Sequence, residues 1–290
     1  MILRELLYGI SILQVIGKVE VNILDIFFNS NIVTKDSIFV ALKGSNSDGH
    51  KYIPDAIDNG AIVIICEEIP FYVQKNINYI KVEESHKALS ILASNFFDNP
   101  SHEIKLVGVT GTNGKTTIVD LSLQLFTSLG LKVGMLSTIE NRINNEIFKS
   151  SHTTPNPLEI NHMLREMINR GCEFCFMEVS SHAICQSRVY GLKFSAAIFT
   201  NITHDHLDYH KTFEEYIKVK KIFFDLLPKS AIALVNNDDK NSKKMLESTS
   251  AKKMTYSLKS MSDFKCKILE RQFQGMLLKI SKIDVWVKLI

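Results

Sequence analysis

Residues 107 to 117 read VGVTGTNGKTT and contain the residue types that bind phosphate groups. Glycines let backbone amides turn toward an anion, a lysine brings positive charge to the β- and γ-phosphates, and a threonine hydroxyl can bind Mg²⁺. The generic pattern GxxxxGK[ST] requires a glycine where this chain has Val109, and any strand-to-helix turn needs glycines. The GKTT ending after an apolar run nevertheless favours phosphate binding by Gly111, Thr112, Asn113, Gly114, Lys115, Thr116 and Thr117.

A second cluster, FMEVSSH at 176–182, places Glu178 at the end of an apolar run. A carboxylate at the end of a strand, in the same sheet as a phosphate loop, is suited to binding the metal of a magnesium nucleotide. The plain alternative is a surface glutamate. A serine hydrolase arrangement of Ser180, Ser181 and His182 is disfavoured, because no GxSxG elbow surrounds the serines.

A third cluster, NITHDHLDYH at 201–210, holds three histidines and two aspartates within seven positions. The composition resembles a metal site, but the side chains of one short segment cannot all converge on one ion. We therefore expect one or two of them to bind metal and the others to cap the next helix or face solvent.

Lys220 falls inside an apolar stripe at helical spacing, formed by Phe213, Tyr216, Ile217, Phe223, Phe224 and Leu227. A lysine on such a face often extends its amine to the surface. The alternative is a buried amine with a lowered pKa, which can react with CO₂ to form a carbamate. A carbamate would offer oxygen ligands to Mg²⁺.

The elements that position these clusters alternate between strand and helix, which predicts the α/β class with a mostly parallel sheet. Asn99-Pro100-Ser101 interrupts the pattern, so we predict a small amino-terminal α/β domain at 1–100 and a sheet domain at 101–290. Expected strands are 38–42, 61–66, 79–82, 104–109, 132–137, 173–180, 194–202 and 231–236, and expected helices are 115–129, 157–169 and 212–227. The polar clusters follow strand ends, where such sheets bind ligands.

Composition narrows the function classes. The 290 residues carry a net charge of +3 with interspersed signs, which gives no support to nucleic-acid binding. The sequence contains no uninterrupted apolar run of about 18 residues, so it predicts no membrane span. We interpret the leucines of 3–13 as one buried helix. Five unpatterned cysteines indicate a reducing, cytoplasmic setting, and the Cys172–Cys175 pair reads as part of a buried strand rather than a metal or redox site.

Five motifs in this order make the chain similar to a known family. They are TGTNGKTT, HTTP at 152–155, MEVSSHAICQSRV at 177–189, FTNITHDHLDYH at 199–210 and EEYIKVKK at 214–221. From about residue 38 to the end, the chain resembles the Mur ligases, and it looks closest to the branch that adds the third amino acid. The loop of that family also lacks the first glycine, so Val109 is expected.

The resemblance implies an ATP-dependent amide ligase of peptidoglycan precursor synthesis. ATP would phosphorylate the γ-carboxylate of D-glutamate in UDP-MurNAc-L-Ala-D-Glu, and a diamino acid would attack, with meso-diaminopimelate favoured over L-lysine. Lys115, Glu178, His206 and carbamylated Lys220 would be catalytic. Mg²⁺ would be held by Thr116, Glu178, His206 and Lys220, and the UDP precursor by Ser30, Thr153, Thr154, Ser180, Gln186 and Arg188. We expect a monomer with no nucleic-acid or membrane partner.

The chain also departs from the family pattern. Asn29-Ser30-Asn31 stands where the family usually has Asp-Ser-Arg, so Ser30 is retained and the arginine is missing. We expect the third, amine-binding domain of the family to have no counterpart here, and we expect these 290 residues alone not to ligate. A non-catalytic nucleotide-binding remnant is the alternative. A ligase like folylpolyglutamate synthetase is disfavoured, since it gives no reason for HTTP and MEVSSHAICQSRV.

Overall fold

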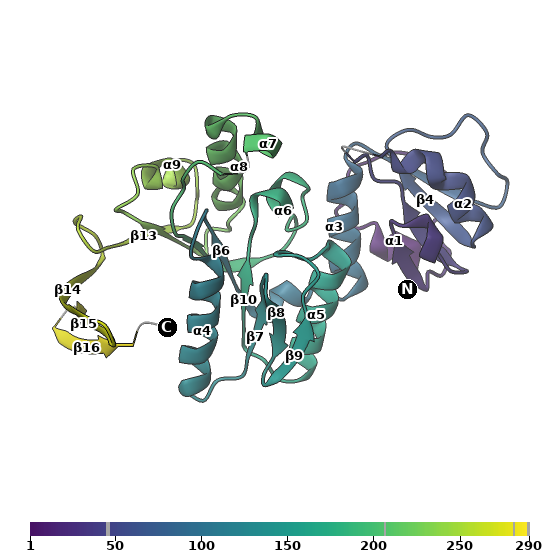
Figure 1. The fold of residues 1–290 in the computed structure, drawn as a ribbon. Helices are drawn as coiled ribbons and strands as arrows, with labels where there is room; N and C mark the ends of the chain where they lie inside the picture. The colour runs from purple at the N-terminus through teal and green to yellow at the C-terminus, as the bar shows by residue number, and fades with distance from the viewer. Residues whose placement is uncertain (45–46, 206, 281, 289–290) are drawn as a thin grey trace. The chain divides into compact units, whose positions relative to one another are not determined.

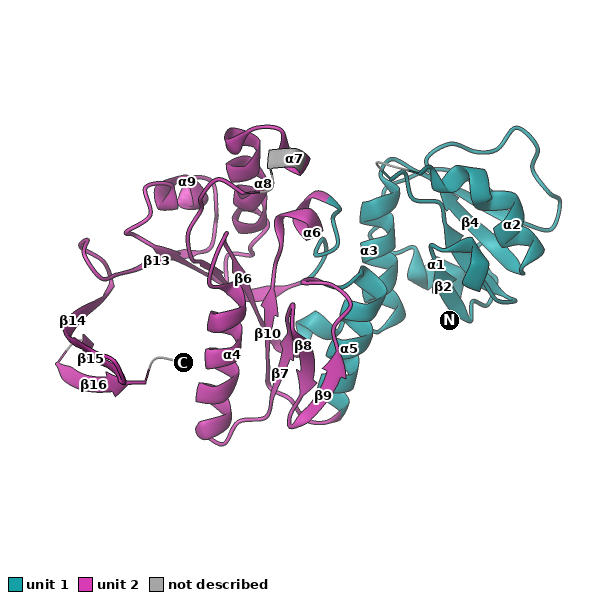
Figure 2. Ribbon diagram, viewed as in Figure 1, with its two compact units in different colours: residues 1–103, 155–169, 186–192 teal, residues 104–154, 170–185, 193–290 magenta. Residues whose placement is uncertain are grey.

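The computed structural model describes residues 1–44, 47–205, 207–280 and 282–288. The chain forms two compact units (Figures 1 and 2). Unit 1 comprises residues 1–103, 155–169 and 186–192, and unit 2 comprises 104–154, 170–185 and 193–290. Unit 1 thus includes two later segments of the chain, and the domains 1–100 and 101–290 stay a prediction.

Unit 1 is built on a five-stranded sheet in the order β1-β5-β4-β3-β2, in which only the edge strand β1 runs antiparallel to its neighbour. Its strands are β1 (Ile12–Ile16), β2 (Asp25–Phe27), β3 (Ser37–Val40), β4 (Ala61–Cys66) and β5 (Asn78–Val82). Its helices are α1 (Leu3–Leu6), α2 (Ile53–Asp58), α3 (Ser85–Phe96) and α5 (Pro157–Asn169), with short 3₁₀ turns at Ser30–Ile32, Gly49–Tyr52 and Pro100–His102.

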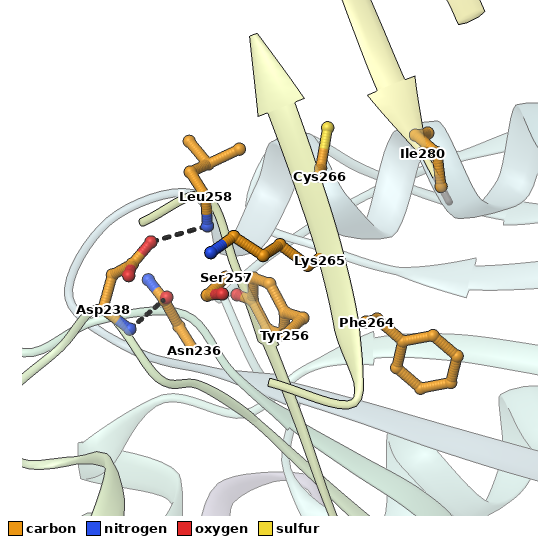
Figure 3. Close-up of a pocket in the computed structure, with 9 residues that line it drawn as sticks. All are labelled: Asn236, Asp238, Tyr256, Ser257, Leu258, Phe264, Lys265, Cys266 and Ile280. Atoms are coloured by element: carbon orange, nitrogen blue, oxygen red, sulfur yellow. Dashed lines mark hydrogen bonds between the residues drawn. The ribbon is translucent and has the colours of Figure 1, made fainter. Parts of the chain in front are cut away.

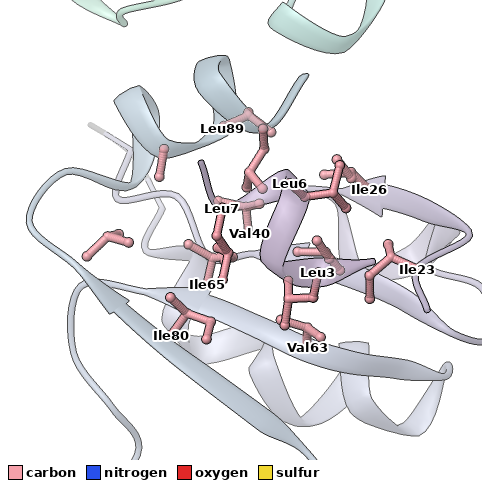
Figure 4. Packing of buried hydrophobic residues seen from close by; sticks show 14 residues of the cluster. Leu3, Leu6, Leu7, Ile23, Ile26, Val40, Val63, Ile65, Ile80 and Leu89 are labelled. Carbon is pink, nitrogen blue, oxygen red and sulfur yellow. The ribbon is translucent and has the colours of Figure 1, made fainter. Parts of the chain in front are cut away.

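An apolar core joins α1 and α3 to one face of this sheet (Figure 4). Leu3 and Leu6 are fully buried with Ile65 of β4 and Ile80 of β5. The prediction of one helix over 3–13 was wrong. Helix α1 ends at Leu6, Gly9 adopts a left-handed φ of +80°, and the β-branched run that follows is strand β1.

Unit 2 is built on an 11-stranded sheet in the order β16-β15-β14-β13-β12-β11-β6-β10-β7-β8-β9. The strands from β14 to β7 in this order are parallel, and antiparallel strands extend both edges. The strands are β6 (Lys105–Thr110), β7 (Val133–Leu136), β8 (Glu140–Ile143), β9 (Glu146–Lys149), β10 (Phe174–Glu178), β11 (Phe194–Phe199), β12 (Ile232–Asn236), β13 (Lys252–Ser257), β14 (Phe264–Gln272), β15 (Gly275–Ile280) and β16 (Ile283–Val287).

The helices of unit 2 are α4 (Lys115–Ser128), α6 (Ser181–Cys185), α7 (Leu207–His210), α8 (Phe213–Asp225) and α9 (Ser242–Leu246). Helix α4 packs on β7 and β10 through Val119 and Leu123. Within the described residues, no helix is long and apolar enough to cross a membrane. The predicted α/β class with a mostly parallel sheet is confirmed.

Gly108, in the middle of β6, lets α8 approach the sheet closely. A Cβ at this position would lie 2.5 Å from the ring of Phe223 and 2.8 Å from the ring of Phe194. Phe223 is buried and belongs to the same helix as Lys220. The absence of a side chain at Gly108 therefore brings Lys220 near the carboxyl end of β6.

Candidate functional site

The predicted phosphate loop connects β6 to α4, so it lies at the carboxyl edge of the sheet as expected. Gly111 and Gly114 both have positive φ, +151° and +83°, which L side chains rarely adopt. A Cβ at Gly111 would overlap the hydroxyl of Thr200, whereas a Cβ at Gly114 would meet no atom within 4 Å. Both positions favour glycine because of their backbone conformation. Gly111 is required for a second reason, because a side chain there would overlap Thr200.

Residues after β11 hold the loop. Thr200 Oγ1 donates to the carbonyl of Asn113 at 2.7 Å, and Asn201 Oδ1 accepts from the Asn113 amide at 3.1 Å. The Thr112 amide donates to the carbonyl of Asn201 at 2.9 Å. Asn236, at the end of β12, in turn donates to the Thr200 carbonyl at 2.9 Å. Hydrogen bonds within the protein therefore fix the loop.

A cavity of about 350 Å³ lies beside Asn236, at the carboxyl ends of β12 and β13 (Figure 3). Tyr256 and Phe264 are among the residues that line it. The Asp238 carboxylate accepts the backbone amides of Leu258 and Ser260 at 2.7 and 2.8 Å. Asp238 is thereby engaged in joining β12 to the loop after β13.

The amine of Lys115 folds back over the loop. Its Nζ donates to the carbonyls of Gly111 and Thr112 at 3.0 and 2.9 Å. Burial lowers the pKa of this amine, while the charges of Glu178 and Asp205 oppose the shift. The two hydrogen bonds to loop carbonyls place the Lys115 amine beside the loop that is predicted to bind phosphate.

The Glu178 side chain is 1% exposed and lies beside the first turn of α4. Its Oε1 accepts from Thr116 Oγ1 at 2.9 Å and from the backbone amide of Thr138 at 2.8 Å. In the described part of the chain, no group donates a hydrogen bond to its Oε2. A hydroxyl and a carboxylate with an available oxygen form an oxygen-rich donor set that fits Mg²⁺.

Lys220 is 1% exposed, so its amine does not reach the surface. The Nζ donates to the Gly111 carbonyl at 3.0 Å and lies 3.5 Å from Thr110 Oγ1 and 4.6 Å from the ring centroid of Tyr216. Burial, and then the charge of Lys115, lower the pKa of Lys220 to about 7, against the opposing effect of Asp205. The structure thus brings both lysines to the phosphate loop and excludes the surface alternative for Lys220.

Three of the predicted precursor-binding residues lie together in unit 2. Thr154 Oγ1 donates to the Glu178 carbonyl at 2.7 Å and accepts from the Ser180 amide at 3.0 Å. Thr153 accepts from Thr138 Oγ1 at 3.1 Å. This polar group therefore adjoins Glu178.

The other three lie in unit 1. Arg188 donates through Nε and Nη2 to Gln186 Oε1 at 2.9 and 2.6 Å. Ser30 is buried in a 3₁₀ turn that the Asn29 side chain caps by accepting from the Asn31 amide at 3.1 Å. Asn31 thus belongs to a locally stabilised turn despite replacing the expected arginine.

His206 lies outside the described residues. The neighbouring histidines have other contacts: the ring of His204 stacks on Phe213 with centroids 4.4 Å apart, and His210 Nε2 lies 2.8 Å from Ser181 Oγ. Thr212, and not a histidine, caps α8 by accepting from the Glu215 amide at 3.2 Å. Among the described residues no group of three His, Cys, Asp or Glu side chains could hold a metal.

Sequence reasoning missed Thr138, Thr200, Asn201 and Asn236 as residues that support the site. Each acts through backbone or side-chain hydrogen bonds to residues on another strand or loop. No local pattern in the FTN segment at 199–201 identifies its contacts with the predicted phosphate loop.

Comparison with known proteins identifies the family. Residues 109–289 match the Mur ligase middle domain, and residues 24–97 match the catalytic domain of the Mur ligase family. The chain belongs to the Mur ligase family. A UDP-N-acetylmuramoyl-L-alanyl-D-glutamate--2,6-diaminopimelate ligase of Cytophaga hutchinsonii is 48% identical over 289 residues, which are 99% of this chain and 60% of that protein. The chain thus spans about 60% of the length of this Mur ligase relative.

Solved structures of Mur ligases have the same fold. A structure of a UDP-N-acetylmuramoyl-L-alanyl-D-glutamate--2,6-diaminopimelate ligase superposes with a TM-score of 0.83 at 24% identity, over 99% of this chain and 59% of that one. The MurF ligase of Thermotoga maritima in complex with ADP gives a TM-score of 0.58 at 21% identity, over 91% and 57%. At these identities the likeness concerns the fold alone.

Proposed function

We propose that this Mur ligase chain binds ATP and UDP-MurNAc-L-Ala-D-Glu for an amide ligation that adds meso-diaminopimelate. The observation that carries the proposal is the convergence of Lys115 and Lys220 on the Gly111 carbonyl, beside the Thr116–Glu178 pair. The 48% identical relative that is named a diaminopimelate ligase supports both the precursor and the amino acid. Because the chain spans about 60% of that relative, the complete activity is part of the proposal.

The phosphate loop would bind the β- and γ-phosphates of ATP. Its glycines orient backbone amides, and the Lys115 amine, which now donates to two loop carbonyls, would instead neutralise phosphate oxygens. Thr116, Glu178 and His206 would hold Mg²⁺, which when bound supplies further neutralisation of phosphate charge. The ADP bound to the related MurF ligase is consistent with a nucleotide in this fold.

Lys220 would complete the magnesium site as a carbamate. Its neutral amine attacks the carbon of CO₂, an N–C bond forms as one C=O π pair moves onto oxygen, and the nitrogen releases one proton to water to give a carbamate anion. A pKa near 7 leaves a large fraction of the amine neutral at physiological pH. The carbamate would reverse the charge of this side chain and place oxygen atoms beside Lys115.

The precursor would present its D-glutamate γ-carboxylate to ATP. A carboxylate oxygen forms a bond to the γ-phosphorus as the bond to ADP breaks. The amine of the diamino acid then forms a bond to the acyl carbon, phosphate leaves, and the nitrogen loses one proton. Thr153, Thr154 and Ser180, which adjoin Glu178, would orient the muramoyl peptide. Ser30, Gln186 and Arg188 of unit 1 would contact the remainder of the precursor. The chemistry is mainly positioning and charge neutralisation.

Binding measurements test this proposal on the 290-residue chain. Calorimetry should detect Mg-ADP and UDP-MurNAc-L-Ala-D-Glu, with weaker binding of UDP-MurNAc-L-Ala, which lacks the reacting carboxylate. Lys115→Ala should lower Mg-ADP affinity about 10- to 100-fold, since a charge-assisted hydrogen bond is lost. A wild-type chain that binds neither the nucleotide nor the precursor would contradict the proposal.

The five free thiols are consistent with the cytoplasm, where we place the reaction. We also propose that the protein is a monomer.

A further inference from the structure

Tyr216 is a fully buried residue of α8 whose side chain contacts two parts of the candidate site. It is 1% exposed and lies one helical turn before Lys220. The sequence pattern accounts for Tyr216 as a core residue, and packing alone would be served equally by phenylalanine. Its hydroxyl and its ring, however, each have a separate polar neighbour.

The hydroxyl of Tyr216 lies 3.3 Å from Thr112 Oγ1, on the phosphate loop. Thr112 Oγ1 also accepts from the backbone amide of Thr203 at 3.0 Å. Burial raises the pKa of the Tyr216 phenol above its ordinary value, so the group is a neutral hydroxyl at physiological pH. Thr112 therefore connects α8, the loop and the segment after β11.

The ring of Tyr216 lies against the Lys220 amine, with 4.6 Å from Nζ to the ring centroid. The ring of His210 also packs on Tyr216, with centroids 5.0 Å apart, and His210 hydrogen-bonds Ser181 at the start of α6. An aromatic face attracts the protonated form of the amine, and the packed ring limits where the amine can move in either form. The ring thus holds Lys220 directed at the Gly111 carbonyl, 3.0 Å away.

We propose that Tyr216 is a positioning residue that fixes the phosphate loop relative to Lys220. The hydroxyl positions the loop through Thr112, and the ring positions the amine. This inference rests on the proposed nucleotide site and adds a residue to it. Tyr216 would act through Thr112 and Lys220, so its effect on nucleotide affinity is indirect.

The test removes the hydroxyl and keeps the ring. Tyr216→Phe in the 290-residue chain should weaken Mg-ADP binding about three- to tenfold by calorimetry, the cost of one hydrogen bond. Affinity for UDP-MurNAc-L-Ala-D-Glu should change less than twofold. Tyr216→Leu also removes the ring and should weaken Mg-ADP binding further than Tyr216→Phe.

A matched control is Tyr79→Phe in unit 1. Tyr79 is equally buried, and its hydroxyl accepts one hydrogen bond, from the Gln74 amide at 3.2 Å. Both phenylalanine variants should lower the melting temperature by similar small amounts, but only Tyr216→Phe should weaken nucleotide binding. Equal Mg-ADP affinities of Tyr216→Phe and wild type would overturn the inference.

Substitution of Thr112, the loop residue next to the Tyr216 hydroxyl, gives an independent measurement of this contact. Thr112→Val removes the other partner of the same contact, so the double variant with Tyr216→Phe should bind Mg-ADP no more weakly than Thr112→Val alone. Additive losses would overturn the Thr112 contact as the cause. If Lys115→Ala weakens Mg-ADP binding and Tyr216→Phe does not, only the proposed role of Tyr216 is overturned. A wild-type chain that binds no Mg-ADP overturns the proposed function and the role of Tyr216 together.

Discussion

Lys115 and Lys220 donate hydrogen bonds to the same atom, the carbonyl oxygen of Gly111, and each does so at 3.0 Å. The two amines come from helices α4 and α8, and the two lysines lie about a hundred positions apart in the sequence. Two ammonium groups close together and away from water repel each other, which contributes to the lowered pKa of Lys220. The arrangement is one that an anion would stabilise, in agreement with the proposed phosphate site.

Lys220→Met tests the cost of this burial through pH. The folded pKa of about 7 lies below the ordinary value of 10.5, so between these values the unfolded chain binds more protons and wild-type stability rises with pH. Below pH 7 the full cost of burying the ammonium is present. Lys220→Met should therefore be more stable than wild type at pH 6, by an amount that shrinks toward pH 9.

Urea unfolding without nucleotide or added CO₂ measures this difference. Lys218→Met, which replaces an exposed lysine on the same helix, is the control. The burial argument would be wrong if Lys220→Met and Lys218→Met had the same pH profile.

The two loop glycines should respond differently to alanine. Gly114→Ala meets no neighbouring atom and should cost about 1–2 kcal/mol of stability, the strain of a left-handed L-residue. Gly111→Ala should cost more, because its Cβ displaces the Thr200 hydroxyl that holds Asn113. Chemical denaturation measures both. If overlap with that hydroxyl causes the excess cost, adding Thr200→Ala should reduce it, and an unchanged excess would argue against overlap.

Glu178→Gln should separate metal binding from folding. Glutamine can still accept from Thr116 and the Thr138 amide through its Oε1, so the melting temperature should change by only a few degrees. The loss of charge should lower the Mg²⁺-dependent part of ADP affinity about tenfold. Calorimetry with and without Mg²⁺ measures this part, and exposed Glu247→Gln is the control. An unchanged magnesium dependence would remove Glu178 from the proposed metal site.

Cys66 should resist alkylation in the folded protein. It is fully buried, and burial raises the pKa of its thiol to about 11. Since the thiolate is the reactive form, iodoacetamide at pH 8 should label exposed Cys185 much faster than Cys66, and urea should abolish the difference. Peptide mass spectrometry gives both rates. Rapid labelling of Cys66 without urea would indicate that unit 1 opens readily.

The sequence predicted the long helices α4 and α5 well. The helices α4 and α5 begin at the expected residues, because Gly114 and Pro157 mark their starts. The short strands β8 and β9 and the change from α1 to β1 were missed, since four or five residues carry too little periodicity.

The contacts around the loop could not be predicted from the sequence, for a different reason. Thr200 meets Asn113 because β11 and β6 are parallel neighbours with Phe199 beside Thr110. Tyr216 was placed correctly in the apolar stripe, but its hydroxyl contact with Thr112 depends on how α8 lies against the loop. Strand order and helix placement, which no single segment encodes, determine both contacts.

The hydrogen bonds from Thr200 and Asn201 to the phosphate loop have a kinetic consequence. A loop that its neighbouring strand already shapes loses little conformational freedom when a nucleotide arrives. Association should then approach the rate of diffusional encounter, without a slow ordering step, and differences in affinity among loop variants should arise mainly from how fast the nucleotide leaves.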